Sequence, residues 1–192
     1  MPAIIGDGFS GLPMVGFDEG GRREEMADLR RKDMFHSPDG LWTIAITDEH
    51  RSLKNSKAKR TIPVHPGLVL LGFLEHATRV APNADDPLSP GREPEGVQRK
   101  RVLPMTRWFG RYPQAIGIYL EGVAMHATRH SFEMRLRAQL KNPSDEHRLN
   151  YLAGYALAAE ERAERYFKGP GAKATARLLV RPCYPHIDLA HL

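Results

Sequence analysis

His-Ala-Thr-Arg-His-Ser-Phe, at residues 126–132, opens the most regular helical pattern in the chain. From Phe132 onward, apolar residues recur every four positions, which predicts an amphipathic helix over residues 126–141. His126 and Arg129 stand three positions apart in this helix and therefore project from one face. An arginine offers a planar fork of donors to phosphate oxygens, and a neighbouring imidazole donates a hydrogen bond or moves a proton. The segment therefore predicts a phosphate-binding helix face.

Two other interpretations of this helix face are a zinc site and a plain solvated surface. His126 and His130 are four positions apart, a spacing that suits two zinc ligands on a helix. The metalloprotease pattern needs a glutamate directly after the first histidine, where this chain has Ala127, and Arg129 would repel a cation. We therefore expect no metal here, and we favour a bound phosphate over the solvated surface.

A second segment, at residues 20–29, also combines an arginine with features of a phosphate-binding site. Gly20 and Gly21 allow the backbone to turn tightly into a helix N-terminus, which is itself an anion site. Arg22 follows where a phosphate would be held, and Glu25 lies three positions later on the same face. Taken alone, the segment is better explained as a charged, solvated first turn, so its interpretation depends on the rest of the chain.

The remaining periodicities predict an α+β fold that is mainly helical and carries a small antiparallel sheet. Two strands are expected, at residues 41–47 and 61–64. The basic residues 54–60 lie between them and form or flank a hairpin turn. Residues 81–103 are rich in proline and charge and predict an exposed loop. Further helices are expected at residues 22–29, 66–80, 108–123 with a split near Pro113, 147–156 and 158–167.

Composition narrows the class of protein. Hydrophobic residues make up 41% of the 192, enough for a core, and the net charge of +5 points to a polyanionic partner. The single cysteine, Cys183, excludes an internal disulfide and indicates a reducing compartment. No apolar run is long enough to span a bilayer, and residues 1–11 carry no secretory signal. We therefore expect a soluble, cytoplasmic protein with no membrane partner.

Five motifs follow one another along the chain. They are Gly20-x-Arg22-x-x-Glu25-Met26-x-x-Leu29, Lys54 before a strand ending Ile62-Pro63-Val64-His65-Pro66, His126-x-x-Arg129-His130-Ser131-Phe132, Leu152-x-Gly154, and Arg165-Tyr166. Together they resemble the catalytic domain of tyrosine recombinases, and most closely the phage-integrase branch. The third motif, with its downstream tyrosine, is the most specific. The resemblance covers residues 11–167, and residues 184–192 also resemble the end of such integrases.

The resemblance implies site-specific DNA recombination, in which DNA is cleaved and rejoined through a 3′-phosphotyrosyl intermediate. Arg22 and Arg129 would clamp the scissile phosphate, and His126 would be the general acid/base. Lys54 would protonate the leaving 5′ oxygen, and Tyr166 would be the nucleophile. We therefore expect Arg22, His126 and Arg129 to converge on one phosphate.

Three further residues belong to the implied site. Lys57 and Lys59 share the hairpin with Lys54, so we expect them to contact DNA, and they are alternatives to Lys54 as the acid. Glu25 would brace the arginines through a buried ion pair.

The chain departs from the family pattern at Tyr155, because most members carry histidine or tryptophan after Leu152-x-Gly154. The Tyr155 hydroxyl could still donate to a phosphate oxygen, and it competes weakly with Tyr166 as nucleophile. The departure supports one alternative, a catalytically silent DNA-binding module of the same fold. A type IB topoisomerase-like enzyme, which shares the active-site logic, is the second alternative.

The resemblance also implies partners and an organisation. Double-stranded DNA would be the partner, with self-association into a tetrameric synapse on DNA, and a phage or another mobile element would be the origin. The chemistry requires no cofactor and no metal, because the phosphotyrosyl ester stores the energy for rejoining. We expect a catalytic domain at residues 1–176 and a C-terminal docking tail at residues 177–192. We also expect either a naturally short member or a catalytic domain without the usual N-terminal DNA-binding domain.

Overall fold

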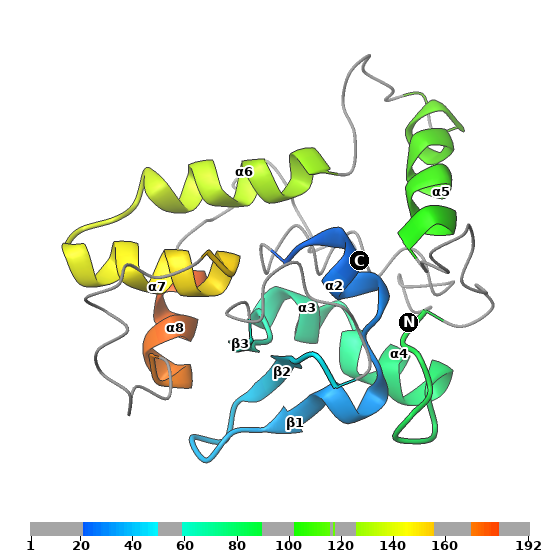
Figure 1. Cartoon of the computed structure of the whole chain (residues 1–192), viewed down its shortest axis with the longest axis horizontal. Helices are drawn as coiled ribbons and strands as arrows, with labels where there is room; N and C mark the ends of the chain where they lie inside the picture. The colour runs from blue at the N-terminus through cyan, green and yellow to red at the C-terminus, as the bar shows by residue number, and fades with distance from the viewer. Residues whose placement is uncertain are drawn as a thin grey trace.

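The computed structural model describes residues 21–49, 59–89, 102–115, 117, 126–155 and 170–180, and the fold is given for these. A three-stranded antiparallel sheet is flanked by helices drawn from the whole length of the described chain (Figure 1). The architecture is α+β and mainly helical, which confirms the predicted fold class.

The sheet has the strand order β1-β2-β3, with β1 at Met34–His36, β2 at Trp42–Ile46 and β3 at Arg60–Pro63. Ile44 on β2 pairs with Met34 on one side and with Ile62 on the other, and all three side chains are buried. Strands β2 and β3 confirm the prediction to within one residue at each end. Strand β1 was not predicted, because three residues carry no readable alternation and pairing with β2 holds them.

The first part of the chain contributes α2 (Arg23–Ala27), the short 3₁₀ helix η1 (Arg31–Asp33), α3 (Pro66–Leu70), α4 (Phe73–Val80) and α5 (Val102–Ala115). The single helix predicted at residues 66–80 is wrong, because Gly72 adopts a left-handed φ of 82° and divides it into α3 and α4. Helix α5 begins earlier than predicted, at Val102, and it runs through Pro113 without the predicted split. Its first turn contains Pro104, whose missing N–H would have no helical partner there.

Three more helices lie side by side at one end of the molecule (Figure 1): α6 (His126–Arg137), α7 (Pro143–Ala153) and α8 (Ala172–Leu179). Helix α7 begins four residues before the predicted residue 147, because the Asn142 side chain caps it by accepting from the backbone N–H of Asp145 at 3.0 Å. The helix predicted at residues 158–167 lies outside the described residues. So do residues 181–192, and the docking of the tail therefore stays a prediction.

The hydrophobic core lies between the sheet and the helices that cover it. Its largest fully buried side chains are Met26, Leu29, Ile44, Ile46, Ile62, Leu68, Met105, Phe132, Leu136, Leu149 and Leu152. Because one core joins α2, β3, α6 and α7, side chains at the ends of these elements have fixed relative positions. No helix in the described ranges is both long and apolar enough to cross a membrane.

Candidate phosphate-binding site

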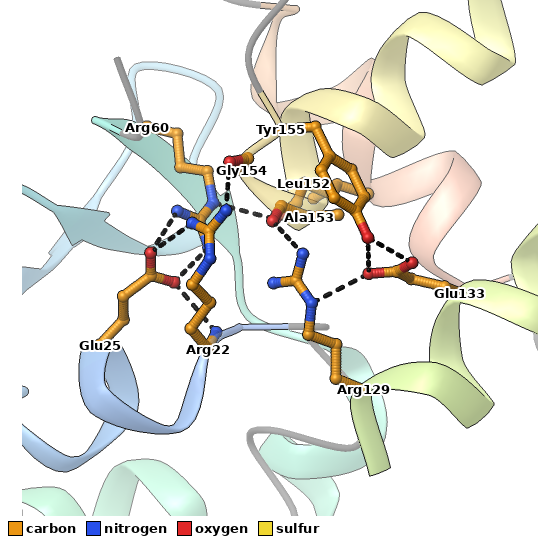
Figure 2. Close-up of polar contacts among 9 residues, drawn as sticks. All are labelled: Arg22, Glu25, Arg60, Arg129, Glu133, Leu152, Ala153, Gly154 and Tyr155. Atoms are coloured by element: carbon orange, nitrogen blue, oxygen red, sulfur yellow. Dashed lines mark hydrogen bonds and ion pairs between the residues drawn. The ribbon is translucent and has the colours of Figure 1, made fainter. Parts of the chain in front are cut away.

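The C-terminal end of α7 gathers three arginines from three other parts of the chain (Figure 2). The last carbonyls of a helix have no partner within the helix, and they carry the negative end of its dipole. Here three consecutive carbonyls each accept from a different guanidinium. The bonds run from Arg60 Nε to Leu152 O at 2.9 Å, from Arg129 Nη2 to Ala153 O at 2.6 Å, and from Arg22 Nη2 to Gly154 O at 2.8 Å.

Gly154 allows this close approach. Its φ of 66° is left-handed, as is usual for the residue that ends a helix. A Cβ at this position would lie 2.5 Å from Arg60 Nη1 and 3.0 Å from Arg22 Nη1. Both the conformation and the space therefore require glycine at the point where the arginines meet.

A buried carboxylate, Glu25, binds two of the three arginines. Its oxygens accept from Arg60 Nη2 at 2.7 Å and Nη1 at 3.2 Å, and from Arg22 Nη1 at 2.9 Å. Only 1% of the Arg60 side chain and 4% of the Glu25 side chain are exposed. The expected ion pair of Glu25 is confirmed. The more buried partner of Glu25, however, is Arg60. In the sequence this arginine belongs to the basic segment predicted to form or flank a hairpin turn.

The environment changes the pKa of both members of this buried pair. Burial alone would raise the pKa of Glu25, but hydrogen bonds and charge from Arg60, together with the bonds from Arg22, outweigh it and lower the pKa. Burial lowers the pKa of Arg60, and Glu25 opposes that effect. The carboxylate is therefore held in its charged form inside the protein.

The lowered pKa of Glu25 makes stability depend on pH. In the unfolded chain a glutamate titrates near pH 4.3, so Glu25 contributes stability above about pH 4.3 and loses it as the pH falls through its lower folded value. We expect the free energy of unfolding to fall as the pH is lowered below about 5. In carbon-13 NMR the Glu25 carboxyl should titrate at a lower pH than in an unstructured peptide of residues 21–29. An equal or higher midpoint would contradict the ion pair.

The third arginine, Arg129, has its own carboxylate on the same helix. Its Nε lies 2.9 Å from Glu133 Oε1, one helical turn along α6, and 6% of its side chain is exposed. The Tyr155 hydroxyl donates to the same carboxylate, at 2.8 Å from Oε2 and 3.0 Å from Oε1. The Tyr155 ring also covers the guanidinium, with Arg129 Cζ 5.1 Å from the ring centroid. This hydroxyl, considered above as a donor to a phosphate oxygen, donates to Glu133 in the structure.

The structure brings together three of the predicted site residues, Arg22, Arg129 and Tyr155. His126 is the first residue of α6, one turn before Arg129, and only its backbone is described. Lys59 is exposed and pairs with Asp48 at 2.7 Å. The predicted residues that lie outside the described ranges are Lys54, Lys57 and Tyr166.

Two residues of the cluster were missed in the sequence. Arg60 opens a strand and is far in sequence from its partners, so no local pattern marked it. Glu133 could have been found, because an arginine and a glutamate four positions apart on a helix are close enough to pair.

The cluster has the chemistry of an anion site. Its three guanidiniums and two carboxylates leave an excess of one positive charge. Arg22 is the most exposed of the three arginines, at 22% of its side chain, and so presents this charge to solvent. Across the described ranges, no group of three acidic, histidine or cysteine side chains is placed to hold a metal ion.

Comparison with known proteins bears on the fold of the chain. No protein-family profile matches the sequence, and no curated protein matches it. Two solved complexes of the XerH site-specific recombinase are similar. The pre-cleavage complex with difH substrate gives a TM-score of 0.50 at 20% identity over 81% of this chain, and the post-cleavage complex with palindromic difH gives 0.51 at 18% over 82%.

The chain therefore has a tyrosine-recombinase-like fold. It spans less than half the length of the two recombinase chains, since the alignments cover 44% and 42% of them.

Proposed function

We propose that this chain cleaves and rejoins double-stranded DNA in site-specific recombination, through a 3′-phosphotyrosyl intermediate. The observation that carries the proposal is the convergence of Arg22 and Arg129 at the end of α7, in a fold similar to that of DNA-bound recombinases. A phosphodiester is already negative, and it gains charge in the transition state. Fixed guanidiniums stabilise that charge, and each such donor contributes about 3–4 kcal/mol to lowering the barrier.

The proposed reaction assigns each group one task. The Tyr166 oxygen bonds to phosphorus while the bond from phosphorus to the 5′ oxygen breaks. His126 accepts the tyrosine proton, and Lys54 or Lys57 gives a proton to the leaving 5′ oxygen. The ion pair of Lys59 with Asp48 makes Lys59 the weaker candidate for this acid. Rejoining is the same step in reverse on another strand, and assembly of four chains on DNA would supply that strand.

Covalent trapping tests the proposal. The chain is incubated at low salt with a pool of nicked duplexes of random sequence. Cleavage near the nick releases a short fragment with a free 5′ hydroxyl, and its loss by diffusion prevents rejoining. We expect an adduct that resists detergent and heat, and sequencing of the trapped DNA should reveal a preferred site. An Arg22→Ala variant that stays folded should trap at least about a hundredfold less. Adduct formation at the same rate in that variant would contradict the proposed role of Arg22.

A second candidate is a catalytically silent DNA-binding module. Two observations favour it. Glu133 forms an ion pair with Arg129, and Tyr155 occupies the position where most members carry histidine or tryptophan. Both features reduce what the site offers to a phosphate. This function would be identified by two results together: the chain binds DNA with an affinity that falls as salt is raised, and it forms no covalent adduct.

A further inference from the structure

We propose that Glu133 and Tyr155 are positioning residues that together fix the guanidinium of Arg129, so that the Tyr155 hydroxyl acts through Glu133 and not on the phosphate. The inference rests on the proposed function, which assigns the scissile phosphate to Arg129. It concerns the position at which the sequence departs from the recombinase pattern.

Three contacts define the orientation of Arg129. Its Nε binds Glu133 Oε1 at 2.9 Å, its Nη2 binds Ala153 O at 2.6 Å, and its Cζ lies over the Tyr155 ring, 5.1 Å from the centroid. Two bonds in the plane of a guanidinium prevent its rotation within that plane, and the attraction of a cation to a nearby aromatic ring adds to this restraint. Figure 2 shows the guanidinium enclosed between the end of α7 and the Glu133 carboxylate.

The Tyr155 hydroxyl completes this arrangement from the other side of the carboxylate. It carries a single proton, which lies within reach of both Glu133 oxygens, at 2.8 and 3.0 Å. The Glu133 carboxylate therefore accepts from both Arg129 and Tyr155, so the hydroxyl limits how far the carboxylate can rotate away from the arginine. At the end of α7, the carbonyl of Ala153 thus holds Arg129 directly, and Tyr155 holds it through Glu133.

The same geometry argues against a phosphate contact by this hydroxyl. To donate to a phosphate oxygen, Tyr155 would have to give up a charge-assisted bond to a largely buried carboxylate. The phosphate would also have to approach Glu133, and the two negative groups would repel each other. Tyr155 is thus suited to support Arg129, and poorly suited to bind the substrate.

A double-mutant cycle separates the two roles. Under this inference, Tyr155→Phe slows cleavage at saturating DNA by about tenfold to a hundredfold. A slightly misplaced Arg129 still binds the phosphate of the substrate, but it no longer matches the geometry of the transition state. DNA affinity should not change, and the melting temperature should fall only slightly, because Glu133 keeps its ion pair with Arg129. In a Glu133→Gln background, Tyr155→Phe should cause little further loss, because the hydroxyl no longer has its charged partner. Equal losses in both backgrounds would overturn the inference.

A second measurement does not depend on cleavage. In nitrogen-15 NMR of the free protein, the Arg129 Nε–H should exchange slowly with solvent because it is bound to Glu133. Tyr155→Phe should speed this exchange, and Tyr151→Phe should not, since the Tyr151 hydroxyl accepts from the backbone N–H of Thr61 instead. Unchanged exchange in Tyr155→Phe would overturn the inference. If the native chain forms no adduct, the proposed function fails, and this measurement still decides the inference.

Discussion

Replacing Arg60 with alanine is expected to lower the free energy of unfolding by about 3–5 kcal/mol, because removing one partner of a buried pair leaves the other charge uncompensated. Arg60 is 1% exposed and donates to Glu25 through both terminal nitrogens. Its Nε also satisfies the carbonyl of Leu152 at the end of α7. The substitution would therefore leave a buried carboxylate with one arginine fewer and a buried carbonyl without this donor.

Urea denaturation followed by circular dichroism measures this loss. Lys59→Ala is the matched control, because Lys59 precedes Arg60 directly and its ion pair with Asp48 is exposed. That pair should contribute less than about 1 kcal/mol. Arg60→Lys should give an intermediate loss, since it keeps the charge but not the planar fork. If Arg60→Ala and Lys59→Ala were equally stable, Arg60 would not hold the cluster together.

Replacing Tyr166 with phenylalanine is expected to abolish the covalent adduct while DNA binding stays the same. Phenylalanine keeps the ring and removes the only atom that can bond to phosphorus in the proposed reaction. Tyr166 lies outside the described residues, so this assignment stays a prediction from the resemblance. The structure bears on its competitor, because the Tyr155 hydroxyl donates to the Glu133 carboxylate. Attack by Tyr155 would require a phenolate directly beside that negative charge.

Denaturing gels of both variants against the trapping substrate decide the assignment. Tyr155→Phe should still form the adduct, at a reduced rate, and Tyr166→Phe should form none. DNA affinity is measured in parallel, so that a folding or binding defect is not mistaken for lost chemistry. An adduct that persisted in Tyr166→Phe and vanished in Tyr155→Phe would reverse the two roles.

Elements defined by neighbouring residues were predictable. Strands β2 and β3 follow from short apolar, β-branched runs. The two errors in the helices are opposite in kind. One helix was predicted to run through Gly72, where a left-handed φ ends it, and another was predicted to split near Pro113, which lies within α5.

The sequence by itself determined the helical face of Arg129 and the pairing of Arg22 with Glu25, because both depend on spacings of three or four residues. Only the tertiary structure decided that Arg60 joins them and that Tyr155 contacts both Arg129 and Glu133. Arg60 meets its carbonyl across 92 residues, and Arg22 meets Gly154 across 132. Which helix carbonyls lack partners, and which guanidiniums the core brings to them, depends on how α2, β3, α6 and α7 pack. No local pattern contains that information.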